Sequence, residues 1–527
     1  MKRVWLYFTI IILTILAIVI VYNKTFVHSQ SVNVNKPNIV LILGDDIGYS
    51  DIQPFGSEIK TPNLQKLADE GIMFSNFYNM SKCEPSRSTL FTGVYKGGKH
   101  SVNFAQILKS EGYYTIHSGK EHWMNWAPDH VFAKNIFDKS LTFRAMSEFF
   151  EPPSKKWSNP FILNGDTVGI DKIYHEKVPF FKTDALTDNA LKWIEKPINA
   201  GQPFFLFLGY GAAHYPLQAR PEDIAKYRGT YQKGWDKIRE ERMKRILSKG
   251  LVPTETQLSP PSSNINKFRG HPKGDDEIRS KIPLYRPWDE LNEIERDELD
   301  LEMSVFAAMV DRMDQNIGRV LNYLEEKEVA DNTIVIYLSD NGSCPYDSNR
   351  DFDFPPGVAE GFRTLSASWA NAGNTPFRYF KQFGHEGGAH THFIVRWPKE
   401  IEAGQITHQQ GHIVDLVPTL LEATRIKYPD LIDSIKPQPL QGISLLPVLK
   451  GDTIPEANFY ISGWTEKFRM FRQKNWKIVK ANGEDWELYN LKNDPTEIRN
   501  LAKEEPEKVE ELEKNYETIK LQTEPKE

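Results

Sequence analysis

Short apolar runs alternate along the chain with longer segments that carry apolar residues on one helical face. The runs at residues 38–43, 204–208 and 333–338 show almost no polar alternation. Such runs are typical of strands that are buried on both faces of a parallel sheet. The longest helical segment carries a single apolar stripe, formed by Phe306, Met309, Val310, Met313, Ile317, Val320, Leu321 and Leu324. The pattern predicts an α/β fold in which helices sandwich a large, mixed, mostly parallel sheet.

The last part of the chain has a different pattern. Short predicted strands over residues 459–462, 468–480 and 486–491 are separated by turn residues and followed by a helix rich in both acidic and basic residues. We therefore expect residues 458–527 to form a smaller C-terminal subdomain, an antiparallel sheet plus a helix. The preceding residues 36–457 are predicted to form the main α/β domain.

The alternation weakens between about residues 227 and 290, which suggests an insertion packed over one side of the core. It contains a run of mixed charge at residues 237–249 and a Pro/Ser/Asn-rich stretch at residues 258–264. The mixed run is expected to be a solvated helix face. The insertion and the Trp-rich loops are candidate walls of a ligand cleft.

The N-terminal residues 1–30 are expected to direct export. Lys2 and Arg3 precede an apolar run from Val4 to Tyr22. This run fits either a signal peptide or an N-terminal membrane anchor, because it is long for a cleaved peptide and lacks a small-x-small site. Basic residues before the run predict that the catalytic body is translocated, either into the periplasm or on the outer side of the inner membrane.

The overall charge is mildly negative, at -6, and no strongly basic block stands alone. Proteins that bind nucleic acid usually carry a concentrated basic patch. Nucleic acid is therefore not an expected partner.

Acidic side chains follow two of the predicted strands. Asp45 and Asp46 come after the first strand, and Asp340 and Asn341 follow the strand at residues 333–338. In open α/β sheets, functional sites lie at the carboxyl ends of the strands. Three carboxylates and an amide oxygen suit Ca²⁺ or Mg²⁺ better than zinc, which prefers His or Cys. Each pair alone is also typical of a turn, but two such pairs at strand ends favour a metal site.

Basic side chains follow three further apolar segments. A lone basic residue after a strand is most often simply exposed, so the repetition is what points to a site. The residues are Lys120 and His122 after the strand at 115–118, His214 after the strand at 204–208, and Lys381 and His385 in a Gly-containing segment before the strand at 392–397.

One of only two cysteines, Cys83, lies in the segment Lys82-Cys-Glu-Pro-Ser-Arg-Ser-Thr-Leu-Phe-Thr-Gly93. Pro85 suits a first helical position and Gly93 suits the position after the last one, which predicts a helix over residues 85–92. Cys83 would lie at its N-terminus with Arg87 one turn further on, so that negative charge is favoured there. The alternative is a free thiol packed at a helix start.

The pattern CxPSR followed by LFTG resembles the signature of the type I sulfatases, the formylglycine-dependent branch of the alkaline phosphatase superfamily. The similarity runs from Asn38 to Pro495 and includes Gly44-Asp-Asp-Ile-Gly-Tyr-Ser-Asp51 and Gly119-Lys-Glu-His122. His385-Glu-Gly-Gly388 is similar to the bacterial arylsulfatase-like branch. Glu84, Glu121 and Trp123 depart from the residues most usual there.

The resemblance implies an alkaline phosphatase-like fold and a sulfuric ester hydrolase of the arylsulfatase type. Cys83 would be oxidised to formylglycine (3-oxoalanine) by a formylglycine-generating or anaerobic sulfatase-maturating enzyme. No disulfide then forms, because Cys344 is left without a partner. One Ca²⁺, or alternatively Mg²⁺, would be held by Asp45, Asp46, Asp340, Asn341 and residue 83.

The resemblance also implies roles for the basic residues. Arg87 and Lys120 would hold the hydrated formylglycine, and His122 would take a proton from its second hydroxyl. His214 and Lys381 would bind the sulfate and protonate the leaving oxygen, and Asp340 would accept the proton of the attacking hydroxyl. Substrate binding would involve Lys120, His214, Lys381 and His385.

Three alternatives concern the substrate and the activity. The preferred substrate is a sulfated carbohydrate, with a small aryl sulfate as the alternative. A phosphodiester or phosphonate monoester hydrolase of the same superfamily would share the metal and the basic groups. A non-catalytic glycan-binding relative is expected to lack the nucleophile or a metal ligand, whereas this sequence has them all.

Overall fold

The computed structural model describes residues 36–524, apart from 99, 123–134, 144–147, 152–159, 177, 263–286, 347–348, 350–352, 435, 456–457, 463–467 and 482. The signal peptide or anchor predicted in residues 1–30 lies outside the described residues. Among the described residues, no helix combines the length and the apolar character that a membrane span needs.

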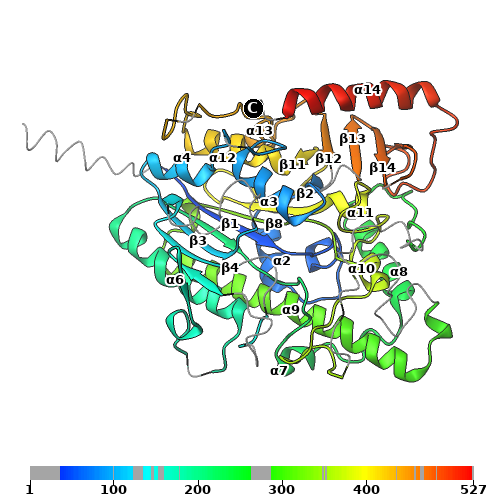
Figure 1. Cartoon of the computed structure of the whole chain (residues 1–527), viewed down its shortest axis with the longest axis horizontal. Coiled ribbons are helices and arrows are strands. Elements are labelled where there is room, and N and C mark those ends of the chain that lie inside the picture. Colours follow the sequence, from blue (N-terminus) through cyan, green and yellow to red (C-terminus); the bar gives the residue numbers. More distant parts are fainter. Residues whose placement is uncertain are drawn as a thin grey trace, which may run out of the picture.

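A mixed sheet of eleven described strands forms the centre of the molecule (Figure 1). Its order is β10-β2-β9-β8-β1-β7-β3-β4-β5-β6, with β11 also paired to β2. The central strands β8, β1, β7, β3 and β4 are parallel to one another, whereas β9 runs antiparallel to both of its neighbours. The strands are β1 (Asn38–Gly44), β2 (Ile72–Tyr78), β3 (Tyr114–Lys120), β4 (Lys139–Phe143), β5 (Phe161–Leu163), β6 (Asp166–Val168), β7 (Phe204–Gly209), β8 (Thr333–Ser339), β9 (His390–Arg396), β10 (Gln405–Thr407) and β11 (Gly411–His412). The predicted α/β class with a large, mostly parallel sheet is confirmed.

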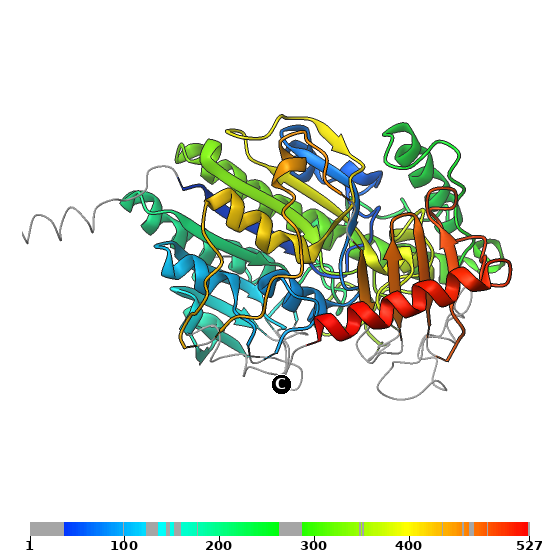
Figure 2. The same cartoon turned by 90° about the horizontal axis from the view of Figure 1, so that it is seen from above.

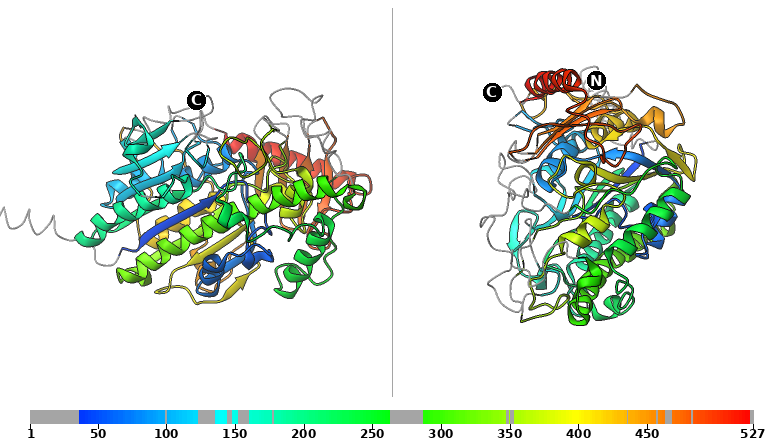
Figure 3. Two further views of the ribbon diagram at one scale, coloured as in Figure 1. Left: turned by 90° about the horizontal axis from the view of Figure 1, so that it is seen from below. Right: turned by 90° about the vertical axis from the view of Figure 1, so that its right-hand side faces the viewer.

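Helices cover both faces of this sheet (Figures 1 and 3). Along β1, Val40 and Ile42 belong to the apolar core on one face, while Ile39, Leu41 and Leu43 belong to the core on the other. This double burial explains why the strand sequence shows no polar alternation. One face carries α2 (Pro62–Asp69), α6 (Lys182–Ala200) and α9 (Glu293–Glu326), and the other carries α3 (Cys83–Thr92), α4 (Phe104–Ser110), α12 (Leu416–Thr424) and α13 (Leu446–Leu449).

The register of the parallel strands brings their carboxyl ends to one level. Gly44 of β1 pairs with Ser339 of β8, and Gly209 of β7 pairs with Gly119 of β3. Gly119 has a φ of +136°, and a Cβ there would lie 1.9 Å from the carbonyl oxygen of Gly209. Only glycine permits this close approach. The residues that follow these strands therefore emerge side by side.

A second, four-stranded antiparallel sheet lies near the C-terminus, in the order β12-β13-β14-β15. Helix α14 lies across it (Figures 1 and 2), and Leu512 and Tyr516 of this helix are buried. The predicted antiparallel sheet plus helix is thus confirmed, whereas the exact division into residues 36–457 and 458–527 stays a prediction. The elements are β12 (Phe459–Ser462), β13 (Arg469–Gln473), β14 (Trp476–Lys480), β15 (Glu487–Asn490) and α14 (Pro506–Thr523).

The described part of the insertion is fixed to the core by buried groups. Helix α8 (Trp235–Ser248) contacts α10 (Ala367–Gly373), and the ring of Trp369 lies 5.6 Å from that of Trp235 and 5.8 Å from that of Trp288. These indoles are buried. They therefore fill the core, and are not walls of a ligand cleft.

The prediction that residues 237–249 form a solvated helix face is wrong for Arg242. Its side chain is 0% exposed. Its NH1 donates to Asp51 Oδ1 at 2.7 Å, and its Nε and NH2 donate to the two oxygens of Glu58 at 2.9 and 2.7 Å. Asp51 in turn accepts the N–H of Gly48 at 2.9 Å. The insertion is therefore tied to the segment that follows β1.

Arg242→Met is expected to lower the free energy of unfolding by about 3–5 kcal/mol, because it leaves the buried Asp51 carboxylate without its cation and leaves Glu58 paired only with Arg245, at 3.3 Å. Urea denaturation followed by tryptophan fluorescence measures this change. The matched control is Lys237→Met on the same helix, which removes an exposed pair with Glu240 and is expected to change stability by about 0.5 kcal/mol or less. Equal effects of the two substitutions would contradict the structural role assigned to Arg242.

Candidate active site

Acidic groups from two adjacent strands meet the start of α3 at the carboxyl edge of the sheet. Ligand atoms of Asp45, Asp46, Cys83 and Asp340 all lie within 4.8 Å of one another, and all four residues are buried. We call these four residues the Asp45 cluster. Asp46 occupies the left-handed region, with a φ of +62°, in the turn that follows β1. This geometry brings together side chains that are far apart in the sequence.

The Asp45 cluster has the donor set of a site for a hard cation. Asp45 Oδ1, Asp46 Oδ2 and Asn341 Oδ1 are buried and accept no hydrogen bond from the described residues. Buried oxygens are normally paired, and carboxylate and amide oxygens are the ligands that Ca²⁺ and Mg²⁺ prefer. The amide nitrogen of Asn341 donates to Asp46 Oδ1 at 2.7 Å, which orients its oxygen. The cluster can therefore bind a metal ion.

Three basic side chains contact the carboxylates of this cluster. Lys120 Nζ lies 2.6 Å from Asp45 Oδ2. Lys381 Nζ lies 2.5 Å from Asp46 Oδ1. The Nε and NH2 of Arg87 both lie 2.8 Å from Asp340 Oδ2. All three cations are buried, at 2% exposure or less, so that fixed positive charge surrounds the site.

Cys83 is the first residue of α3, two residues earlier than predicted. Lys82 has extended backbone and caps the helix, and its carbonyl accepts the N–H of Ser86 at 3.0 Å. Pro85 then occupies the third helical position, where its missing N–H would also have had no partner within the helix. The helix ends at Gly93 as predicted, with a φ of +67°.

The thiol of Cys83 is not activated as encoded. Burial raises its pKa to about 11, although Lys120 and Lys381 oppose this shift. A nucleophilic cysteine needs a lowered pKa, because the thiolate is the reactive form. Both Cys83 and Cys344 are free and buried.

Two predicted histidines also lie at this edge of the sheet. His214 Nε2 is 3.6 Å from Asp46 Oδ2, and its Nδ1 is 2.8 Å from the carbonyl oxygen of Tyr215. Burial lowers the pKa of His214 to about 4 despite the nearby Asp46 carboxylate. His122 has a φ of +54°, and burial together with Lys120 and Arg87 holds its pKa well below the usual range. For both rings, burial disfavours the charged form.

His385 is placed differently from the other predicted residues. Its described side-chain contacts are a 3.0 Å pair with Glu487 of β15 and ring contacts with Tyr379 and Phe383. None of them is with the Asp45 cluster. Conversely, the sequence did not single out Lys82, whose pKa is lowered to about 8 by burial and by Lys381. In the sequence, the only indication of a role for Lys82 was its position next to Cys83.

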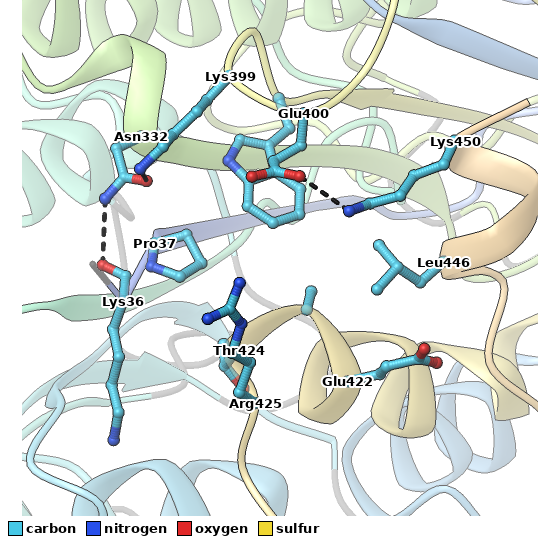
Figure 4. Close-up of a pocket in the computed structure, with 12 residues that line it drawn as sticks. Lys36, Pro37, Asn332, Lys399, Glu400, Glu422, Thr424, Arg425, Leu446 and Lys450 are labelled. Atoms are coloured by element: carbon cyan, nitrogen blue, oxygen red, sulfur yellow. Dashed lines mark hydrogen bonds and ion pairs between the residues drawn. The ribbon is translucent and has the colours of Figure 1, made fainter.

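Figure 4 shows a cavity of about 390 Å³ at the opposite edge of the sheet. Its lining includes Pro37 and Asn332, which precede β1 and β8. Lys450 is paired with Glu400 at 2.8 Å and is turned toward it in the figure. This cavity contains no member of the Asp45 cluster.

Comparison with known proteins agrees with this geometry. The family model described as Sulfatase matches residues 37–426, and the model described as N-sulphoglucosamine sulphohydrolase, C-terminal, matches residues 376–524. The chain belongs to the sulfatase family. It is thus a formylglycine-type sulfatase of the alkaline phosphatase superfamily and a sulfuric ester hydrolase.

Several curated relatives of this sulfatase cover most of its length. An uncharacterized sulfatase of Schizosaccharomyces pombe is 31% identical over 90% of this chain and 92% of its own length. An arylsulfatase of Klebsiella aerogenes is 28% identical, covering 78% of this chain and 91% of the relative. An N-acetylglucosamine-6-O-sulfatase of Bacteroides thetaiotaomicron is 25% identical, covering 90% and 84%.

Solved structures share the fold. The crystal structure of Ps i-CgsB in complex with k-i-k-neocarrahexaose has a TM-score of 0.66 at 23% identity, covering 93% of this sulfatase and 94% of that chain. A structure determined with its substrate D-glucosamine-2-N,6-O-disulfate has a TM-score of 0.60 at 21% identity, covering 93% and 98%. The phosphonate monoester hydrolase of Agrobacterium radiobacter has a TM-score of 0.57 at 18% identity, covering 92% and 95%.

Proposed function

We propose that this sulfatase hydrolyses sulfate esters of carbohydrates through a formylglycine made from Cys83. The observation that carries the proposal is the Asp45 cluster with its ring of buried cations, because a sulfate ester needs fixed positive charge where its oxygens gain charge. Oxidation of Cys83 would supply, after hydration, a hydroxyl that attacks sulfur and a second one from which sulfate is expelled. A cysteine in a small buried site at a helix N-terminus suits this use.

Asp45, Asp46, Asp340, Asn341 and residue 83 would hold one Ca²⁺, with Mg²⁺ as the alternative. When bound, such an ion supplies Lewis-acid stabilisation of the sulfate oxygens. An all-protein set of oxygen ligands favours Ca²⁺, because Mg²⁺ usually keeps several waters. The unpaired oxygens of Asp45, Asp46 and the neighbouring Asn341 support this assignment.

The side chains of this chain divide the proton transfers among them. Arg87 and Lys120 hold the charge that develops at residue 83, and His122 accepts a proton from it. His214 and Lys381 bind the sulfate and donate a proton to the leaving oxygen, and Asp340 accepts the proton of the attacking hydroxyl. General acid help of this kind is commonly worth about 10²–10⁴ in rate. His385, paired with Glu487, is the least direct of the proposed substrate-binding residues.

The carbohydrate substrate class rests on the relatives. Curated relatives include an N-acetylglucosamine-6-O-sulfatase and N-acetylgalactosamine-6-sulfatases, and two structural neighbours were solved with sugar ligands. An aryl sulfate is the alternative, because an arylsulfatase is also among the relatives. The N-terminal residues 1–30 support export. The required partner would be an enzyme that oxidises Cys83 to formylglycine.

The first test compares rates on two substrate classes with purified, converted enzyme. We expect kcat/KM for an aryl sulfate to exceed that for an aryl phosphodiester with the same leaving group, and a panel of defined sulfated saccharides to contain the best substrate. Preference for the diester would instead support a phosphodiester or phosphonate monoester hydrolase. Absence of turnover on every ester, with residue 83 converted, would support a non-catalytic glycan-binding protein.

A further inference from the structure

The segment that carries Lys381 lies between the other catalytic loops and the C-terminal sheet. We call residues 378–389, which end in the short helix α11 (Glu386–Ala389), the Lys381 loop. The N–H of Lys381 donates to the carbonyl of Ser343 at 3.1 Å, and the N–H of Gln382 donates to the carbonyl of Ser81 at 2.6 Å. Ser81 lies two residues before Cys83, and Ser343 lies shortly after Asp340. The position of this loop therefore sets where the Lys381 ammonium meets the Asp45 cluster.

The backbone on both sides of Lys381 is strained. Tyr379 has a φ of +63° and Gln382 has a φ of +82°. The left-handed region is unfavourable for side chains of this size. Residues remain in such conformations only where the surrounding structure over-determines them, and they cluster at functional sites. The loop thus needs contacts that hold it from outside.

The C-terminal sheet and the segment that follows it supply those contacts through buried charges. Lys477 of β14 lies 2.6 Å from Glu386 Oε1 of the loop and 2.7 Å from Glu497 Oε1. The backbone N–H of Glu386 donates to Glu497 Oε2 at 2.8 Å. Lys477 and Glu497 are 0% exposed, and Glu386 is 2% exposed.

The second carboxylate oxygen of Glu386 is also fully used. It accepts from Tyr78 Oη at 2.7 Å and lies 2.9 Å from His390 Nδ1. Glu386 thereby joins the C-terminal sheet to β2 and β9. A buried ion network of this kind adds little net stability but fixes one geometry, because each charge has only one set of partners.

We propose that Lys477 and Glu497 are positioning residues for sulfate transfer, because they fix Lys381 through Glu386. The inference rests on the proposed role of Lys381 in binding the sulfate and protonating the leaving oxygen. Neither residue contacts the Asp45 cluster, so that each acts only through the loop. The C-terminal sheet is in this sense part of the catalytic apparatus, although it contributes no group to the Asp45 cluster.

The test measures kcat/KM of Glu497→Gln, in the converted full-length enzyme, over a series of aryl sulfates with increasing leaving-group pKa. A displaced Lys381 gives less help to a leaving oxygen, so the loss is expected to grow along the series, reaching about a hundred-fold for the poorest leaving group. Lys477→Met combined with Glu386→Gln and Glu497→Gln, which removes the three charges of this group together, is the second variant if the first fails to fold. It is expected to give the same dependence.

The matched control is Leu512→Ala on α14, which weakens the packing of the C-terminal sheet without touching the loop. It is expected to lower thermal stability while leaving the ratio of rates along the series unchanged. An equal loss on every substrate with Glu497→Gln would overturn the positioning role. Lys381→Met separates the two proposals. If Lys381→Met also loses kcat/KM equally on every aryl sulfate of the series, the proposed role of Lys381 itself is wrong.

Discussion

Cys83→Ala is expected to lower turnover of sulfate esters by about 10⁴-fold or more, because it removes the only precursor of the proposed nucleophile. The metal-binding carboxylates and the basic residues stay in place, so that substrate is still bound. The side chain of Cys83 is 2% exposed and small, and its loss is not expected to unfold the protein. Steady-state kinetics on an aryl sulfate, with thermal unfolding measured in parallel, checks both statements.

The control for this substitution is Cys344→Ala, which removes the other buried cysteine and is expected to keep sulfatase activity. The mass of the peptide containing residue 83 gives an independent measurement. In active protein it is expected to differ from the encoded mass by the exchange of a thiol group and one hydrogen for a carbonyl oxygen. Full activity in protein whose peptide has the encoded mass would rule out the formylglycine mechanism.

Removal of the metal ion is expected to cost about a thousand-fold in kcat/KM, since charge stabilisation by a bound ion is worth several kcal/mol. Dialysis against a chelator, followed by addition of Ca²⁺ or Mg²⁺, measures the loss and its reversal. The ion is also expected to stabilise the fold, by about 2.7 kcal/mol at a concentration one hundred times its Kd. Stronger restoration by Ca²⁺ is the expected result.

Asp45→Asn tests whether the Asp45 cluster is the site of this effect. The variant is expected to lose both the activity and the Ca²⁺-dependent rise in thermal stability. Asp415→Asn is the matched control, because Asp415 is also a buried carboxyl but accepts the N–H groups of His412 and Ile443 away from the cluster. A Ca²⁺-dependent rise in stability that persists in Asp45→Asn would show that the metal ion binds at another site.

The parts of the fold that the sequence predicted well are those with a single dominant signal. The strands β1, β7 and β8 are buried on both faces, so their sequences are almost purely apolar. β2 did not stand out, because Ser75 and Asn76 interrupt its apolar pattern. Their polar groups are paired with His408 and Arg472, more than three hundred residues away in the chain. Contacts with such distant residues produce no local pattern in the sequence.

The candidate site was predictable to a similar extent. The positions after two strand ends identified Asp45, Asp46, Asp340 and Asn341, because the parallel register brings these residues to one edge of the sheet. The partners of His385 and Arg242 could not be predicted, since Glu487, Asp51 and Glu58 belong to other segments. A charged residue is exposed by default, and only tertiary structure shows where an opposite charge reverses this expectation. Residues 1–30 and the domain boundaries stay predictions.

The burial of Cys83 limits when the chain can mature. In the folded protein an enzyme cannot reach a side chain that is 2% exposed and surrounded by Asp45, Asp340 and Lys381. These neighbours come from three segments, two of which are synthesised long after residue 83. The Cys83 thiol is therefore accessible to a modifying enzyme during an interval of folding. This interval ends when β8 joins the sheet and the Lys381 loop packs beside residue 83. If residue 83 is oxidised, faster folding would shorten this interval and lower the fraction of molecules that become active.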